Sequence, residues 1–157
     1  MRRLFKEYLL NKMTENEKII LVTADLGYGM WDKIRDTFPQ RFINTGAAEQ
    51  TAIGIAIGMA RSGLIPVVYS ITPFLLYRPF ELIRNYINHE KIPVKLIGGG
   101  RDKDYEHDGF SHWAEDDREI MNCFRNIRSY WPDTPERLLS LTNRIDEDYP
   151  MYINLKR

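Results

Sequence analysis

Apolar residues are arranged in two different patterns along this chain, and segments with one pattern alternate with segments with the other. Short apolar runs bounded by polar residues predict buried strands at 19–23, 41–44, 65–69, 93–97, 126–130 and 151–155. Apolar residues at helical spacing (Leu4, Tyr8, Leu9 and Met13) predict an amphipathic first helix. Further helices are predicted at 31–38, 46–60 and 74–89, and from Thr134 onward. The alternation predicts an α/β fold: a doubly wound, mostly parallel sheet with helices on both faces.

The predicted helix 46–60 is apolar on nearly every side, so we expect it to be buried on all faces. Glu49 is the exception, because it places an acid in the first turn. The positive helix N-terminus favours the charged carboxylate, whereas burial favours the protonated acid. These residues alone allow two interpretations. The simpler one is an acid that complements the helix dipole, and the other is a proton-sharing group.

Length, charge and cysteine content narrow the class of protein. A chain of 157 residues is expected to form one domain with a real core. The 22 basic and 22 acidic residues cancel, so no electrostatic footprint for nucleic acid is present. Cys123 is the single cysteine, which excludes an internal disulfide and fits a reducing compartment. We find no signal peptide and no apolar run of the ~20 residues that span a membrane. A cytoplasmic domain with no membrane or nucleic-acid partner is therefore expected.

The segment from Gly46 to Ala60 (Gly-Ala-Ala-Glu-Gln-Thr-Ala-Ile-Gly-Ile-Ala-Ile-Gly-Met-Ala) resembles a known family signature. It is similar to the pyrimidine-binding domain of the transketolase family of thiamine diphosphate enzymes, and the resemblance covers nearly the whole chain. In that family the matching glutamate hydrogen-bonds N1′ of the aminopyrimidine ring of the cofactor. It promotes the imino form that takes the proton from the thiazolium carbon. The resemblance therefore implies this role for Glu49 and thiamine diphosphate as cofactor.

Three aromatic residues stand at positions i, i+3 and i+6 of the predicted helix 74–89: Phe74, Tyr77 and Phe80. On a helix the first two share a face and the third lies partly round from it. Such a stripe by itself is usually part of a core. Its place in the chain, however, matches the three aromatics that line the family's aminopyrimidine pocket. The resemblance therefore assigns these residues to cofactor binding, with Pro79 distorting the helix just before Phe80.

The stretch from Asp108 to His112 (Asp-Gly-Phe-Ser-His) lies in the long irregular segment 101–117 and resembles the family's Asp-Gly-Pro-Thr-His motif. The resemblance implies that Asp108 contacts a substrate hydroxyl and that His112 takes part in proton transfers at the donor carbonyl. A solvated loop histidine is one alternative. A metal site from His107, Asp108 and His112 is another, but the spacing is not a standard zinc pattern. We therefore predict no metal site in this chain.

Asp25 and Leu26 follow the first predicted strand and precede a Gly-x-Gly sequence. As a dinucleotide fingerprint this is weak, because no third glycine stands at Asp32. The segment is more similar to the family's Ala-Asp-Leu sequence, whose acid lies near the thiazolium ring and the subunit contact. We therefore include Asp25 and Leu26 among the predicted cofactor-binding residues.

The side chains with which the family binds substrate phosphate do not match here. The corresponding serine, histidine and arginine positions fall on Gly29, Gly100 and Trp131. Phosphate recognition needs cationic forks or N–H donors. The substrate is therefore expected to lack a conventional sugar phosphate or to bind it differently, with Arg78, Arg84 and Arg101 as possible replacements.

Two further family features are not found in this sequence: the Gly-Asp-Gly…Asn motif that holds the magnesium diphosphate, and the carboxyl-terminal domain. We therefore expect residues 1–157 to be a single pyrimidine-binding domain of a split enzyme that transfers two-carbon ketol units. A separate chain would hold Mg²⁺ and the diphosphate, in a homodimer or heterotetramer. A β-type subunit of a 2-oxoacid-using enzyme and a non-catalytic interaction subunit are the alternatives.

Overall fold

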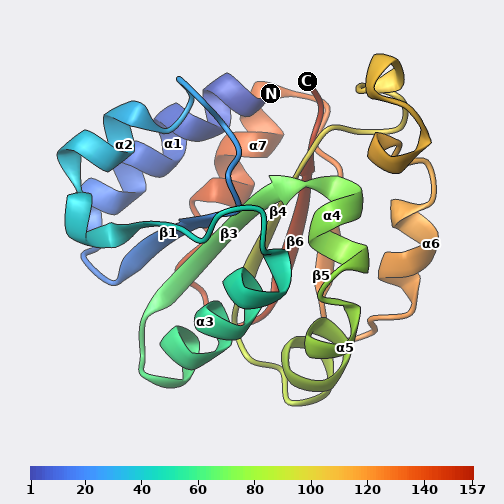
Figure 1. Cartoon of the computed structure of the whole chain (residues 1–157). Coiled ribbons are helices and arrows are strands. Elements are labelled where there is room, and N and C mark those ends of the chain that lie inside the picture. Colours follow the sequence, from blue (N-terminus) through green and yellow to red (C-terminus); the bar gives the residue numbers. More distant parts are fainter.

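The computed structural model describes all 157 residues and contains one six-stranded sheet (Figure 1). The strands are β1 (Ile19–Thr23), β2 (Phe42–Asn44), β3 (Ile65–Ile71), β4 (Lys95–Gly99), β5 (Arg128–Tyr130) and β6 (Met151–Leu155). Their order is β2-β1-β3-β4-β6-β5, and every neighbouring pair is parallel. The predicted doubly wound sheet is confirmed, and it is parallel throughout.

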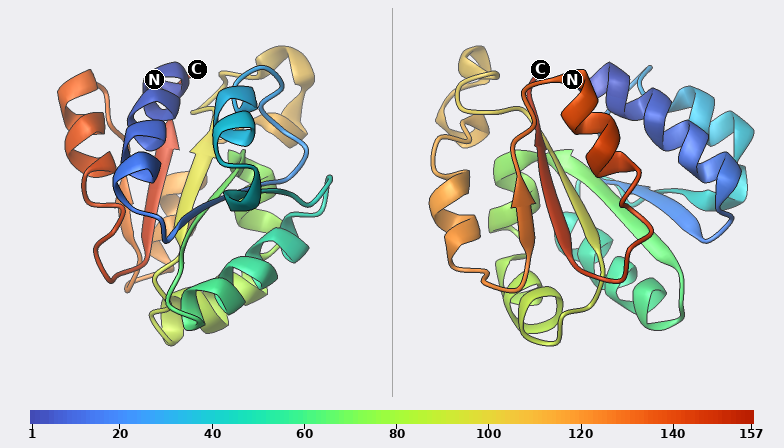
Figure 2. Two further views of the ribbon diagram at one scale, coloured as in Figure 1. Left: turned by 90° about the vertical axis from the view of Figure 1, so that its left-hand side faces the viewer. Right: turned by 180° about the vertical axis from the view of Figure 1, so that it is seen from behind.

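Helices cover both faces of the sheet, because consecutive strand residues point to opposite sides. On β1, Ile19 and Leu21 belong to one core, whereas Ile20 and Val22 belong to the other. The first core packs under α1 (Arg2–Glu15), α2 (Asp32–Thr37) and α7 (Pro135–Thr142). The second packs under α3 (Glu49–Arg61), α4 (Thr72–Tyr77), α5 (Phe80–Leu82) and α6 (Asp117–Asn122). Figure 2 shows the two helical layers on either side of the strands.

The predicted helix 74–89 is interrupted in the structure. Helix α4 ends at Tyr77, α5 has only three residues, and Ile83–His89 form a π-helix. The break falls at Pro79, which has no N–H to donate and whose ring clashes with a preceding carbonyl. Strand β3 extends to Ile71 rather than ending at residue 69, and β5 begins at Arg128 rather than at residue 126. Strand β4 begins at Lys95 rather than at residue 93, and α6 was not predicted.

Helix α3 differs from its prediction in two ways. It begins at Glu49 rather than at residue 46, because Gly46 adopts a positive φ of 70° that ends the preceding strand segment. The expectation of burial on all faces was wrong. Gln50, Thr51, Gly54, Ile55 and Gly58 are exposed, since no element of this chain packs over the side turned away from the sheet. None of the helices in the chain is long and apolar enough to cross a membrane.

The carboxyl ends of the parallel strands place the predicted site residues along one edge of the sheet. Asp25 follows β1, Glu49 follows β2, α4 follows β3, and the segment 101–117 follows β4. Gly100 turns the chain out of β4 with a φ of 93°, and a Cβ there would clash with the ring of Tyr105. Both chain termini lie at this same edge (Figure 1).

Candidate functional site

Glu49 is a buried acid with two side-chain partners. It lies in the first turn of α3, and only 2% of its surface is exposed. Ser70, on the adjacent strand β3, donates to Oε1 at 3.0 Å. Arg78, which directly follows α4, donates from Nη1 to Oε2 at 2.6 Å. The carboxylate is therefore held from two sides in a nearly dry environment, where such hydrogen bonds to a charged group are strong.

The partner of Glu49 on the solvent side is far less buried than Glu49 itself. The side chain of Arg78 is 46% exposed. Its guanidinium carbon lies 4.0 Å from the centre of the Phe74 ring, within the range of a cation–π contact. A planar cation thus lies over an aromatic face while donating to the buried carboxylate.

A cavity of about 640 Å³ adjoins this pair. The cavity is lined by Phe74 and Tyr77 of α4 and by Arg78, the residue after α4. It is also lined by Phe110 and Trp113 of the 101–117 segment. The hydroxyl of Tyr77 donates a short hydrogen bond to Asp116, which ties the helix to the end of that segment. Burial, and then the Asp116 carboxylate, raise the pKa of Tyr77. Tyr77 therefore stays a hydrogen-bond donor at neutral pH.

His112 and Asp108 come from one motif but lie in different surroundings. The ring of His112 packs edge-on against Phe74 with centroids 4.9 Å apart, and Nδ1 lies 3.0 Å from the Ser111 hydroxyl. Asp108 is exposed, with Oδ2 3.3 Å from Nε2 of His107, and it does not line the cavity. The structure therefore brings His112 to the Phe74 wall and leaves Asp108 outside it. No group of three or more histidine, cysteine, aspartate or glutamate side chains could hold a metal ion.

Three other predicted residues lie away from Phe74. Phe80 packs against Phe124 with ring centroids 5.1 Å apart and does not line the cavity, because the chain changes course at Pro79. Asp25 and Leu26 line a separate hollow of about 250 Å³ beside the ends of β1 and β2. The Asp25 backbone N–H donates to Asn44, and Thr23 donates to the carbonyl of Leu26. The aromatic wall of the cavity is therefore Phe74 and Tyr77 without Phe80.

The three arginines considered for anion binding differ in availability. Arg101 is buried, and its guanidinium donates to Asn154, Pro132 and Asp133. Arg84 donates to its neighbour Asn85 on the surface. Arg78 is the one of the three that lines the cavity. Neither the Glu49–Arg78 pair nor the Ser70 partner was predicted, since Ser70 and Arg78 lie 21 and 29 residues from Glu49 along the chain.

The fold and this geometry define a class of protein. Doubly wound parallel sheets bind their ligands beyond the carboxyl ends of the strands, and an aromatic-lined cavity with a few converging polar groups is typical of small-molecule sites. A family model described as "Transketolase, pyrimidine binding domain" matches residues 1–157. The chain therefore belongs to this family.

Individual relatives agree with the family match. The chain is 31% identical over 159 residues to the putative transketolase C-terminal section of Methanocaldococcus jannaschii, covering 100% of this chain and 50% of the relative. It is 27% identical over 159 residues to the 6-deoxy-6-sulfo-D-fructose transketolase subunit SqwH of Clostridium sp. (strain MSTE9), covering 100% and 49%. A solved structure described as "Split gene transketolase, inactive beta4 tetramer" superposes with a TM-score of 0.86 at 30% identity, covering 99% and 51%. The chain thus spans about half the length of these relatives.

Proposed function

We propose that this chain is the pyrimidine-binding part of a split, thiamine diphosphate-dependent, transketolase-like enzyme that transfers two-carbon ketol units. Glu49 would activate the cofactor, and a partner chain would hold the diphosphate and Mg²⁺. The observation that carries the proposal is the buried carboxylate of Glu49 beside the aromatic wall of a cavity.

The residues around Glu49 suit an aminopyrimidine. Such a ring is planar and stacks on aromatic faces, and once it is protonated at N1′ it offers a ring N–H to a carboxylate. The guanidinium of Arg78 has the same properties, and it lies over Phe74 while donating to Glu49. The site therefore already accommodates a flat nitrogen donor. Because Arg78 is half-exposed, it can leave Glu49 for solvent when a ring takes its place.

Each side chain then has a role that follows from its position. When bound, thiamine diphosphate supplies the carbon that carries the two-carbon unit. Glu49 would hold the proton at N1′ of the pyrimidine, and Phe74 and Tyr77 would confine the ring. His112, packed on Phe74, would exchange protons with the donor carbonyl, since an imidazole can both give and take a proton. For Asp108, a contact with substrate would require the 101–117 segment to bring it nearer.

A partner chain is part of the proposal. This sequence has no diphosphate-binding motif, and a magnesium diphosphate needs a dedicated set of oxygen ligands. One of the relatives that align with the whole of this chain is named as a transketolase subunit. A neighbour with a similar structure is described as an inactive beta4 tetramer of a split-gene transketolase. Both descriptions support a chain that is active only with its partner.

The substrate is proposed to be a ketose that is not bound through the usual phosphate contacts. Arg101 is committed to internal hydrogen bonds, and Arg84 lies on the surface beside Asn85. Arg78, once released from Glu49, is then the one arginine of the three at the cavity. Initial rates of the assembled enzyme with xylulose and with xylulose 5-phosphate would test this. A strong preference for the phosphorylated ketose would contradict it.

The central experiment compares Glu49→Gln with Glu81→Gln, a matched change at an exposed glutamate. Each variant is assembled with the chain from the same genome that carries the magnesium-diphosphate motif. We expect Glu49→Gln to lower kcat by about 10²–10⁴-fold, the range of a lost general acid–base group, and Glu81→Gln to leave it unchanged. Equal activity of both variants would instead support a non-catalytic subunit. If only pyruvate or another 2-oxoacid served as donor, the chain would belong to a 2-oxoacid-using enzyme.

A further inference from the structure

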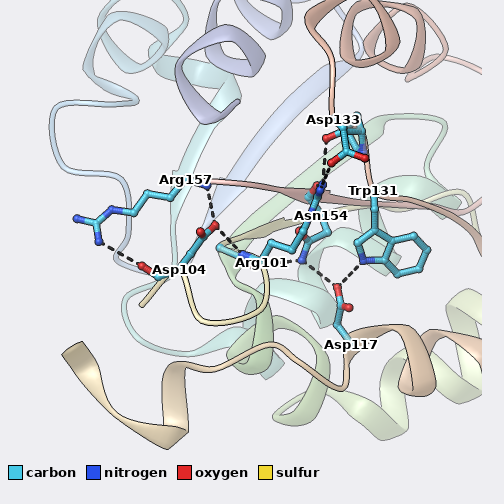
Figure 3. A network of polar contacts seen from close by, with 9 residues as sticks. Arg101, Asp104, Asp117, Trp131, Asp133, Asn154 and Arg157 are labelled. Carbon is cyan, nitrogen blue, oxygen red and sulfur yellow. Dashed lines mark hydrogen bonds and ion pairs between the residues drawn. The ribbon is translucent and has the colours of Figure 1, made fainter. Parts of the chain in front are cut away.

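The segment 101–117, which carries His112, is fixed at both ends to the same side chain of β6. Arg101 is the first residue of the segment and Asp117 is its last, and both are buried. Asn154, fully buried on β6, accepts from Nε of Arg101 at 3.0 Å and donates from Nδ2 to Oδ2 of Asp117 at 2.9 Å. Figure 3 shows Asn154 between the two.

The same amide also reaches the start of α4. Nδ2 of Asn154 lies 3.2 Å from Oγ1 of Thr72, the first residue of α4, and 3.1 Å from the carbonyl of Gly100. Thr72 in turn donates to that carbonyl at 2.7 Å. Helix α4 carries Phe74 and Tyr77. One side chain therefore contacts both ends of the His112 segment and the base of the aromatic wall.

We propose that Asn154 is a positioning residue that sets His112 against the aromatic wall of α4. The consequence for catalysis rests on the function proposed above, whereas the effect on the segment does not. No contact of Asn154 with the cavity is involved, since it acts through Arg101, Asp117 and Thr72.

An amide is the side chain that this position requires. It must accept from a guanidinium with one end and donate to a carboxylate with the other, and an amide does both. Oδ2 of Asp117 also accepts from Trp131 at 2.7 Å and from Tyr152 at 2.8 Å. An aspartate at 154 would put a second carboxylate against this oxygen in a buried site, where like charges repel strongly.

The test uses one variant that removes the amide at position 154 and a second variant that moves the amide to position 117. Asn154→Asp keeps the acceptor for Arg101 but loses the donor to Asp117. The double variant Asn154→Asp, Asp117→Asn restores one amide and one carboxylate with their positions exchanged. Asp133→Asn is the control, because it changes an exposed partner of Arg101 and leaves every Asn154 contact in place. Hydrogen exchange of the purified chain and the kinetics of the assembled enzyme are measured for all of them.

We expect Asn154→Asp to speed amide exchange in residues 101–117 and at the start of α4 by at least about tenfold, with α1 and α7 unchanged. In the assembled enzyme kcat should fall by about 10–100-fold, with KM affected less, since a misplaced catalytic group costs rate. The double variant should recover part of both losses, because the amide nitrogen introduced at position 117, which donates to the carboxylate introduced at position 154, can no longer accept from Trp131 and Tyr152. Asp133→Asn should show neither loss. If Asn154→Asp does not fold, recovery by the double variant still supports the proposal.

Three results would overturn it. One is unchanged exchange in Asn154→Asp. Another is a double variant no better than the single one, and the third is failure of both to fold, which would make Asn154 a determinant of the whole fold. If the wild-type assembly has no transferase activity, the proposed function fails. The exchange data then still decide whether Asn154 holds the segment.

Discussion

Two buried charged residues lie at opposite edges of the sheet, and their partners differ in kind. Glu49, at the carboxyl edge, is 2% exposed, and Lys95, at the amino edge on β4, is 1% exposed. Glu49 is paired on one side with the half-exposed side chain of Arg78. Lys95 donates from Nζ to two main-chain carbonyls, those of Glu147 at 2.7 Å and Tyr149.

Under the function proposed above, this difference distinguishes the binding site at Glu49 from the structural contact at Lys95. Main-chain carbonyls in a folded loop have no alternative position, so nothing can replace them at Lys95 without unfolding that loop. A half-exposed arginine can rotate into water, so a ligand with the same donor geometry can take its place at Glu49. A buried charge with an exchangeable partner therefore marks the functional edge, and burial by itself does not.

The largest expected effect follows from removing Arg78, the exchangeable partner of Glu49. In the isolated chain, Arg78→Ala leaves the buried carboxylate with only Ser70, and we expect a loss of about 1–2 kcal/mol in the free energy of unfolding. The same change in a Glu49→Gln background should cost much less, because no buried charge is left without its partner. Urea unfolding of the four proteins measures this coupling. Equal losses in both backgrounds would mean that the pair contributes nothing.

The contribution of Lys95 to the free energy of unfolding should depend on pH. Burial lowers the pKa of Lys95 from 10.5 to about 8. Between these values the unfolded chain binds more protons than the folded one, so rising pH increases the contribution of Lys95 to stability. Relative to Lys95→Met, wild type should gain at most about 1.4 kcal/mol per pH unit across that window. Denaturant unfolding at pH 7, 8, 9 and 10 checks this, and a constant difference would show that Lys95 does not titrate there.

The smallest expected effect concerns the bond between α4 and the 101–117 segment. Tyr77→Phe removes the hydroxyl that donates to Asp116 and keeps the aromatic wall. A loss of about 0.5–1.5 kcal/mol is expected, typical of one hydrogen bond. Faster hydrogen exchange near Asp116 should accompany it. Tyr86→Phe, which removes a hydroxyl from a half-buried tyrosine elsewhere on the same face, is the control. If the two variants behave alike, the Tyr77–Asp116 bond has no special part in holding the segment.

The sequence predicted what depends on local pattern and on a family motif. The alternation of predicted strands and helices identified the doubly wound, mostly parallel sheet. The Gly46–Ala60 signature identified Glu49 as the central acid. The resemblance assigned Phe80 to cofactor binding, with Pro79 expected to distort the helix before it. The course of the chain after Pro79 takes Phe80 to Phe124, outside the cavity. The exposed side of α3 was missed because an apolar helix was assumed to be covered within one chain.

Contacts between segments that lie far apart along the chain could not be predicted from the sequence. Arg78 and Glu49 lie 29 residues apart, and Arg78 was considered only as an anion ligand. Asn154 had one visible signal, a single amide within the apolar run Met-Tyr-Ile-Asn-Leu. A polar residue in a buried strand must be hydrogen-bonded. Which groups it bonds depends on how β4, β6 and α4 come together, and only the structure shows that.

The most direct test of this account is a crystal structure of the chain bound to its diphosphate-binding partner with thiamine diphosphate and Mg²⁺. We predict that a pyrimidine ring nitrogen lies within hydrogen-bond distance of the Glu49 carboxylate and against Phe74. Arg78 should have left Oε2 of Glu49. A cofactor bound elsewhere, with the Glu49–Arg78 pair intact, would contradict the proposed role of Glu49.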